Sequence, residues 1–418
     1  MSESAMIPRA SIIIPTYNRC DELGKTLETM TEQDIDPRGF EVIVADDGSS
    51  DGSADVARSF AGRLRLKYYF QEDEGFRAGA ARNGGARLAA APILIFLDSG
   101  TLAGPGLVSG HLAVQAEGAG AGQRRAVMGY CYGYNAFREK KWVPESFDTL
   151  RPAEIVQRNK DNTEFADIRE RDFTRGGSDP MKWPVPWLYF FTMNCSVPTE
   201  DYWAVGGFDE MFRSWGVEDV EFAYRLYHNG STLILSRDAW TIEEPTDRPV
   251  KRLLYSLMRN GRLFLDKHRD PYIEILSDAY LSLRLTSIFE ESYALERWTR
   301  EARELDVRAE IEAAAAGLDP GVKLAIFGCG PSVPGWLPAA VLADFDAGLL
   351  ARALSSPAAA GGTHTGHHAI GLRTALPADS ADVVIVTSRL RGLWERYGDR
   401  ITQEAGRIGR QVVLTSRP

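Results

Sequence analysis

The 418-residue chain has few cysteines and no long apolar run. Its cysteines, Cys20, Cys131, Cys195 and Cys329, lie far apart and form no Cys-x-x-Cys pair. Neither a disulfide framework nor a zinc site is therefore expected, and a reducing compartment is favoured. No stretch approaches the roughly 20 apolar residues that a membrane span needs. Residues 1–9 lack a basic segment followed by an apolar one, so the sequence predicts a cytoplasmic protein without a transmembrane segment.

An excess of basic residues is also lacking. The chain has 58 acidic and 48 basic residues, for a formal net charge of -10, which argues against a nucleic-acid partner. Hydrophobic residues make up 44% and charged residues 25% of the chain, a balance typical of globular proteins with sizeable cores. A chain of this length is too long for one ordinary domain, so two or three are expected.

Strand-like and helix-like segments alternate in the first 245 residues. Apolar, β-branched runs at 10–15 and 40–45 flank a segment, 20–33, whose apolar residues have helical spacing. The alternation continues to an apolar strand at 93–97. This order predicts an α/β fold with a mostly parallel, Rossmann-like sheet. Ligands of such sheets bind at the carboxyl ends of the strands.

Polar residues stand at the predicted ends of the first two strands. They are Pro15, Thr16, Tyr17, Asn18, Asp46 and Asp47. Carboxylates there can accept hydrogen bonds from a uracil or from ribose hydroxyls, and an aromatic ring can stack on the base. The alternative is an ordinary pair of strand-end turns, in which such residues are common.

A second cluster lies in a glycine-rich segment and at the end of the 93–97 strand. Arg77 and Arg82 can neutralise a diphosphate, although both could be solvated helix charges. Asp98, followed by Ser99, is a candidate ligand for a cation that bridges two phosphates.

A third cluster is Trp215, Glu218 and Asp219. An indole offers an apolar face to a sugar ring, and Asp219 can take the proton of an attacking hydroxyl, amine or thiol as general base. The alternative is that both carboxylates only complement the dipole at a helix start.

Five ordered motifs resemble family 2 inverting glycosyltransferases of the GT-A fold over residues 1–245. They read SIIIPTYNR, VADDGSSDGS, DEGFRAGAARNGGA, IFLDSG and NCSVPTEDYWAVGGFDEMFRSWGVEDVEFAYRL. The last resembles the galactosyltransferase-like half of chondroitin-polymerase-type enzymes. The resemblance implies a UDP-sugar or related donor, a hexosyl or N-acetylhexosaminyl transfer, and a glycan, natural product or peptide acceptor. It also implies roles for single residues: nucleoside contacts at Pro15, Tyr17, Asp46 and Asp47, diphosphate and metal contacts at Arg82 and Asp98, a sugar or acceptor contact at Glu218, and the base at Asp219.

The metal motif departs from this family. The usual Asp-x-Asp reads Asp98-Ser99-Gly100, and the downstream histidine ligand is missing. The resemblance implies Mn²⁺ or Mg²⁺ held at Asp98. Glu244 (or Glu243) is the candidate ligand that replaces the missing charge. Two alternatives stay open, namely diphosphate neutralisation by arginines without metal, and a non-catalytic protein that binds nucleotide or glycan.

The remaining segments are expected to have accessory roles. Residues 138–186 read as a loop-rich insertion, 246–317 as a helical linker, and 318–418 as a small Rossmann-like α/β domain with four strands. A glycine-rich turn at 328–330 and an acidic strand end at Asp344 or Asp346 resemble class I methyltransferases, which bind S-adenosylmethionine. A lone turn of this kind is weak support, so packing, homodimerisation or acceptor docking is the alternative. The stretch with His364, His367 and His368 is expected to be a flexible loop. Aromatic residues are expected in the acceptor cleft or the core: Trp183, Trp187, Tyr189, Phe190 and Trp203.

Overall fold

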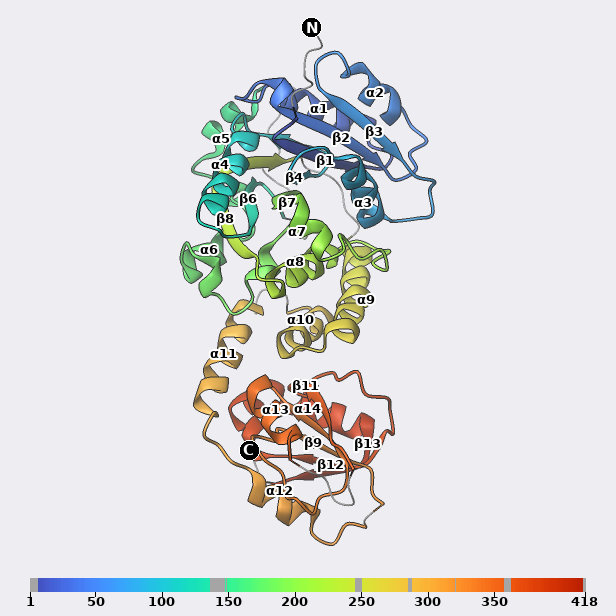
Figure 1. Ribbon diagram of the computed structural model, residues 1–418, viewed down its shortest axis with the longest axis vertical. Helices are drawn as coiled ribbons and strands as arrows, with labels where there is room; N and C mark the ends of the chain where they lie inside the picture. The colour runs from blue at the N-terminus through green and yellow to red at the C-terminus, as the bar shows by residue number, and fades with distance from the viewer. Residues whose placement is uncertain are drawn as a thin grey trace. The chain divides into compact units, whose positions relative to one another are not determined.

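A computed structural model describes residues 7–135, 147, 149–244, 250–284, 288–319, 321–356 and 362–415. The chain divides into two compact units, Met1–Asn260 and Gly261–Pro418. Each unit has its own sheet flanked by helices (Figure 1), which confirms the expected α/β class. The boundary between the two units falls inside a helix, Val250–His268, that belongs to the segment expected as a linker. In the described residues, no helix has the length and apolar character that crossing a membrane would require.

The first unit is built on an eight-stranded sheet in the order β3-β2-β1-β4-β7-β6-β8-β5. Strands β1 to β4 are mutually parallel where they pair, whereas β7 runs antiparallel to β4 and β6, and β5 runs antiparallel to β8. The strands are β1 (Ala10–Thr16), β2 (Phe40–Asp46), β3 (Leu66–Phe70), β4 (Ile93–Leu97), β5 (Thr101–Ala103), β6 (Arg125–Tyr132), β7 (Asn194–Pro198) and β8 (Thr232–Glu243).

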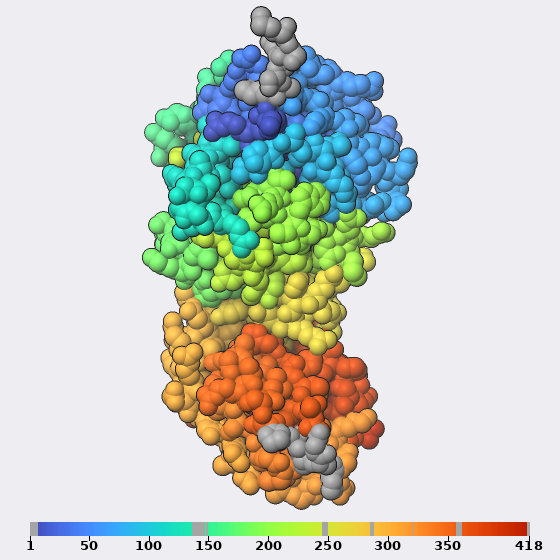
Figure 2. Space-filling model, in the orientation of Figure 1, coloured from blue at the N-terminus to red at the C-terminus, as the bar shows by residue number. Residues whose placement is uncertain are grey.

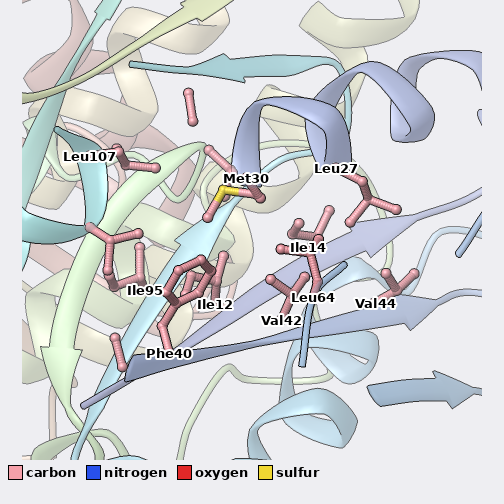
Figure 3. Packing of buried hydrophobic residues seen from close by; sticks show 14 of the residues in the cluster. Ile12, Ile14, Leu27, Met30, Phe40, Val42, Val44, Leu64, Ile95 and Leu107 are labelled. Carbon is pink, nitrogen blue, oxygen red and sulfur yellow. The ribbon is translucent and has the colours of Figure 1, made fainter. Parts of the chain in front are cut away.

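Helices cover this sheet, and the apolar spacing seen in the sequence shows which face they bury. In α1, Leu23, Leu27 and Met30 are fully buried, and Figure 3 shows Leu27 and Met30 beside Ile12 and Ile14 of β1. Burial of such side chains contributes about 1.5–3 kcal/mol each. The helices of this unit are α1 (Cys20–Met30), α2 (Ser53–Ser59), α3 (Ala78–Leu88), α4 (Leu107–Gly120), α5 (Pro152–Asn159), α6 (Glu170–Gly176), α7 (Thr199–Ala204) and α8 (Glu218–His228), followed by α9 (Val250–His268), which ends in the second unit.

Two glycines let α3 approach the sheet closely. A Cβ at Gly84 would lie 2.1 Å from the Tyr69 ring, and one at Gly85 would lie 3.0 Å from Ile13. Larger residues would push the helix outward and displace the side chains that it carries toward the strand ends. The space-filling view shows the early segments (blue and teal) and residues near 200–230 (green) packed into one continuous surface of this unit (Figure 2).

The expected loop-rich insertion is more ordered than the sequence indicated. Its described part contains α5, α6 and short 3-10 turns, while residues 138–146 and 148 lie outside the described residues. A buried ion pair anchors it: Arg169 Nη2 lies 2.6 Å from Asp167 Oδ2 and donates to the Gly129 carbonyl at 2.7 Å. Because a buried charge pair leaves no hydrophobic periodicity, the pattern could not reveal this anchor.

The second unit has a parallel five-stranded sheet in the order β11-β10-β9-β12-β13. Residues 365–368, expected as a flexible loop, form its edge strand β11, and this expectation was wrong. The strand pairs with β10, and the Ala340 N–H beside it donates to His364 Nδ1 at 3.2 Å. The elements are α10 (Pro271–Ser282), α11 (Ile288–Glu301), α12 (Arg308–Ala315), β9 (Leu324–Phe327), β10 (Ala340–Asp344), α13 (Ala347–Leu354), β11 (Thr365–His368), β12 (Ala381–Val386), α14 (Arg391–Ile408) and β13 (Gly409–Leu414).

Candidate active site

The carboxyl ends of β1 and β2 lie side by side, with Thr16 opposite Asp46 in the register. Asp46 is fully buried. Its carboxylate accepts hydrogen bonds from the Ser49 N–H at 2.6 Å and from the Tyr68 hydroxyl. These hydrogen bonds let Asp46 hold the turn that follows β2. The neighbouring Asp47 bonds to different groups.

Asp47 joins the first predicted cluster to the second. Its Oδ2 accepts from the Arg77 backbone N–H at 2.8 Å, and its Oδ1 accepts from Gln71 Nε2 at 2.5 Å. Burial raises the pKa of the Asp47 carboxyl. Gly48 makes this arrangement possible, because its φ is +92° and a Cβ would lie only 2.4 Å from the Asp73 nitrogen.

Tyr17 and Asn18 lie on the solvent side of this edge. The Tyr17 side chain is 45% exposed, and its hydroxyl donates to Asp73 Oδ2 at 2.8 Å. That hydrogen bond raises the pKa of Tyr17. Asn18 has a φ of +50° and accepts from the Ser50 N–H at 2.8 Å. The Tyr17 ring is thus oriented by its hydroxyl while its surface stays accessible.

Arg82 connects the second predicted cluster to the third. It is 3% exposed. Its Nη2 donates to Asp98 Oδ1 at 2.8 Å, and its Nη1 lies 3.7 Å from Glu218 Oε1. The guanidinium also sits over the Phe208 ring, 5.4 Å from the centroid. Asn83 holds the backbone of Phe208 in place. Its Nδ2 donates to the Phe208 carbonyl and its Oδ1 accepts from the Phe208 N–H, each at 2.9 Å.

Glu218 and Asp219 begin α8 after a constrained turn. Gly216 and Val217 have φ angles of +87° and +77°, and a β-branched residue in that region is strained. Asn260 of α9 holds the turn, donating to the Ser214 carbonyl at 2.8 Å and to the Gly216 carbonyl at 2.6 Å. Backbone strain and a dedicated anchor are common at functional sites.

The environment of these two carboxylates favours their protonated forms. Burial raises the pKa of both, and for Glu218 the adjacent Asp219 raises it further. Glu218 is buried, whereas Asp219 is partly exposed. Arg82 opposes the shift in each case. Asp219 is therefore the more accessible member of the pair.

Several buried polar atoms at this edge have no hydrogen-bond partner among the described residues. They are Thr16 Oγ1, Ser99 Oγ, Arg82 Nε, Arg82 Nη1 and Glu218 Oε2. The parallel pairing of β1 with β4, from Ala10 with Ile93 to Ile13 with Phe96, brings the carboxyl ends of both strands to this edge. Leaving such groups unsatisfied costs about 1–3 kcal/mol each, so natural proteins keep them where water or a ligand completes the bonding.

Comparison with known proteins identifies the family of this chain. A sequence model described as glycosyl transferase family 2 matches residues 11–192, and one described as the N-terminal domain of galactosyltransferase matches residues 175–246. Validoxylamine A glucosyltransferase of Streptomyces hygroscopicus subsp. limoneus is 41% identical over 417 residues, covering 98% of this chain and 91% of that protein. The chain belongs to glycosyltransferase family 2. It is a glycosyltransferase that uses a nucleotide-sugar donor.

Other relatives match about half of the chain. Chondroitin synthase of Escherichia coli is 34% identical over 233 residues, which cover 54% of this chain and 33% of that protein. Among solved structures, the mannosyltransferase PcManGT of Pyrobaculum calidifontis in complex with GDP-Man and Mn²⁺ matches with a TM-score of 0.46 and 21% identity, covering 75% of this chain and 77% of that one.

The residues predicted for a metal do not form a ready metal site in this family member. Asp98 is bonded to Arg82, and Glu244 Oε1 lies 2.5 Å from Lys25 Nζ. The main chain does bring Glu244 next to the motif, because its N–H donates to the Gly100 carbonyl at 2.9 Å. In the described part of the chain, no group of three or more His, Cys, Asp or Glu residues is arranged to hold a metal ion.

Of the aromatic residues expected in the cleft or core, four are buried. Trp183, Trp187, Tyr189 and Phe190 are at most 4% exposed and contribute to aromatic packing contacts. Trp203 is 38% exposed, and Arg87 lies over its ring. The expected sugar platform at Trp215 is partly exposed at the turn before α8.

Sequence reasoning missed several residues that build this edge. Gln71 follows β3 directly, so the strand-end rule that found Asp47 could also have found it. Asn83 stands next to Arg82 within a recognised motif, yet its contact with Phe208 spans 125 residues. No local sequence pattern indicated a role for Asn260, because its hydrogen-bond partners lie on a turn more than 40 residues earlier.

The carboxyl edge of the second sheet has an open pocket of about 480 Å³, lined among others by Pro331, Asp346 and Arg352, but the buried acidic residue at this edge is engaged by the chain's own groups. The methyltransferase-like pattern places a ligand-binding carboxylate at Asp344 or Asp346. Asp346 caps α13, accepting from the Gly348 and Leu349 N–H groups at 2.9 and 3.1 Å.

Asp344 is fully buried with Arg389. Arg389 Nε donates to Asp344 Oδ2 at 2.7 Å, and Arg389 Nη2 donates to Oδ1 at 3.2 Å. The Gly330 N–H donates to the same carboxylate at 2.9 Å. The chain's own groups thus occupy the Asp344 carboxylate.

Proposed function

We propose that the first unit transfers a glucosyl group from UDP-glucose, with inversion, to a hydroxyl of a small natural product. The observation that carries the proposal is the set of unpartnered buried polar groups around Arg82, beside the partly exposed Asp219. The relative named validoxylamine A glucosyltransferase supports the sugar and the acceptor class, and validoxylamine A is the first acceptor to test.

The nucleoside end of the donor is assigned to the β1–β2 edge. The exposed ring of Tyr17 offers a stacking surface for uracil, and Asp47 lies beside it with an oriented carboxylate. Thr16 Oγ1 and Ser99 Oγ, both unpartnered among the described residues, provide neutral hydrogen-bonding groups where the diphosphate would pass. Arg77 contributes charge at the start of α3, where its side chain pairs with Glu74 at 2.8 Å.

The chemistry needs one base and one displacement. The acceptor oxygen attacks the anomeric carbon and forms the new glycosidic bond, while the bond from that carbon to the diphosphate oxygen breaks. The nucleoside diphosphate leaves with the bonding electron pair, and the acceptor proton passes to the Asp219 carboxylate. Its raised pKa makes Asp219 a stronger base than an ordinary aspartate. Glu218 lies beside it to bind a sugar hydroxyl.

We derive no step through Mn²⁺ or Mg²⁺, because both predicted ligands are engaged by cationic side chains. The reducing cytoplasm is the proposed location, since all four cysteines are free thiols.

A transfer assay tests the proposal. Purified protein, UDP-glucose and validoxylamine A should yield a glucosylated product whose anomeric configuration, read by NMR, is opposite to that of the donor. A panel of other UDP-sugars and hydroxylated acceptors serves as the comparison set. Tight UDP binding with no transfer or donor hydrolysis across the whole panel would replace this proposal with the non-catalytic binding protein.

A further inference from the structure

Three cationic side chains surround the turn where the family motif has lost its second carboxylate. Arg19 Nη1 donates to the Ser99 carbonyl at 3.4 Å. Lys25 Nζ pairs with Glu244 at 2.5 Å, and Arg82 Nη2 pairs with Asp98 at 2.8 Å. Arg19 ends the motif SIIIPTYNR but had no predicted role, and Lys25 lies outside the motifs.

The backbone explains why these groups meet. The Gly100 N–H donates to Thr26 Oγ1 of α1 at 3.0 Å, which places Lys25, the preceding residue of that helix, beside the turn. On the other side, the Glu244 N–H donates to the Gly100 carbonyl at 2.9 Å, continuing the pairing of Thr101 with Glu243. One turn is thereby fixed to both α1 and the end of β8.

An aspartate side chain at position 100 would lie against the guanidinium of Arg19. A Cβ built on Gly100 would lie 3.4 Å from Arg19 Nη1, and the φ of +91° disfavours any side chain there. The two remaining candidate ligands, Asp98 and Glu244, already have counter-ions. A divalent cation at this turn would have to break both ion pairs and approach three positive charges. A diphosphate, in contrast, would meet donors that are suited to anionic oxygens.

We propose that Arg19, Lys25 and Arg82 neutralise the donor diphosphate in place of a divalent cation. The inference rests on the proposed function and specifies the charge chemistry of the same site. It assigns Lys25 and Arg19 to donor binding. Lys25 reaches this turn from α1, and Arg19 reaches it from the position just before α1. Binding of the nucleotide then draws Lys25 and Arg82 from their carboxylates, and Arg19 from the Ser99 carbonyl, to the phosphates.

The test is calorimetric binding of UDP to the full chain in EDTA and in Mn²⁺. For wild type, the Kd in EDTA should lie within about threefold of the Kd with Mn²⁺. Lys25→Met should weaken UDP binding in EDTA by about tenfold or more, because a charge next to the phosphates is lost. Mn²⁺ should restore part of this affinity, since Glu244 is then available as a ligand.

A matched control and a second readout make the test specific. Lys67 forms a similar pair with Glu41 at 2.9 Å, and its side chain is 35% exposed against 33% for Lys25. Lys67→Met should leave the UDP Kd unchanged, and circular dichroism checks that both variants fold. Electron paramagnetic resonance of Mn²⁺ without nucleotide should show binding only in Lys25→Met.

Each other outcome has a definite reading. UDP binding by wild type that disappears in EDTA and returns with Mn²⁺ would overturn this inference and leave the proposed function standing. Equal behaviour of Lys25→Met and Lys67→Met would remove Lys25 from the site. The absence of UDP binding under every condition would instead overturn the proposed function.

Discussion

The carboxyl edges of the two sheets differ in how their buried polar groups are hydrogen-bonded. At the carboxyl edge of the first sheet, Arg82 and Glu218 are buried with polar atoms that lack partners among the described residues. At the carboxyl edge of the second, Asp344 and Arg389 are just as buried, but they satisfy each other and take further backbone hydrogen bonds from Gly330 and to Ala302.

The difference shows that a Rossmann-like strand order does not by itself make a ligand site. Ligands bind such sheets at the carboxyl ends of strands, but only where binding adds hydrogen bonds that the protein does not already have. A fully satisfied buried pair gains nothing from a ligand and would lose its own bonds. At the first edge buried polar groups still lack partners among the described residues, whereas at the second edge Asp344 and Arg389 are bonded to each other.

The largest expected effect comes from removing the proposed base at the first edge. Asp219→Asn should lower kcat by about two to four orders of magnitude, because the amide cannot accept the acceptor proton. The UDP Kd should stay close to that of wild type, since the amide keeps the shape of the side chain. Asp344→Asn at the second edge is the control, and it should lower stability without a comparable loss of kcat. Ordinary turnover by Asp219→Asn would transfer the role of base to Glu218.

Breaking the pair at the second edge should affect stability. Arg389→Met leaves Asp344 buried without its counter-ion, and loss of one partner of such a pair costs about 3–5 kcal/mol. Denaturant unfolding measures this change. Adding Asp344→Leu should recover much of it, because an apolar pair replaces the ion pair. Calorimetry with S-adenosylmethionine should show no binding to wild type, and a saturable signal would mean that the second edge opens for a ligand.

The smallest expected effect concerns a buried carboxyl that holds a loop of the second unit. Glu274 accepts hydrogen bonds from the Ile370, Gly371 and Arg373 N–H groups at 2.5, 3.2 and 3.3 Å. Burial raises its pKa from 4.5 to about 7. A raised carboxyl pKa favours the protonated folded state, so its contribution is present below pH 4.5 and is lost as pH rises through 7.

Thermal melts of the full chain between pH 5 and pH 8 would measure this loss. Wild type should become less stable over that window, and Glu274→Gln should flatten the dependence because the amide does not titrate. An increase in wild-type stability across the same window would show that the three N–H groups hold Glu274 ionised, contrary to this prediction.

The sequence was a reliable guide wherever local pattern and chain order carried the information. The leucine spacing of α1, the apolar run of β2 and the strand-end position of Asp47 can each be seen without a structure, because burial on one face imposes a period on the chain. It failed at β11, whose glycine and histidine residues have no alternating apolar pattern. The edge strand forms there only because β10 offers an unpaired neighbour.

What the sequence determined by itself is therefore the family, the α/β class and the identity of the polar motifs, because these depend on residues that are close in the chain. Which of those polar groups remain available for a ligand was decided by the tertiary structure. Asp46 is held by Tyr68, Glu244 by Lys25 and Asp344 by Arg389, the last two pairs joining residues 219 and 45 positions apart. A charge's partner is set by distance in space, and local pattern does not encode that distance.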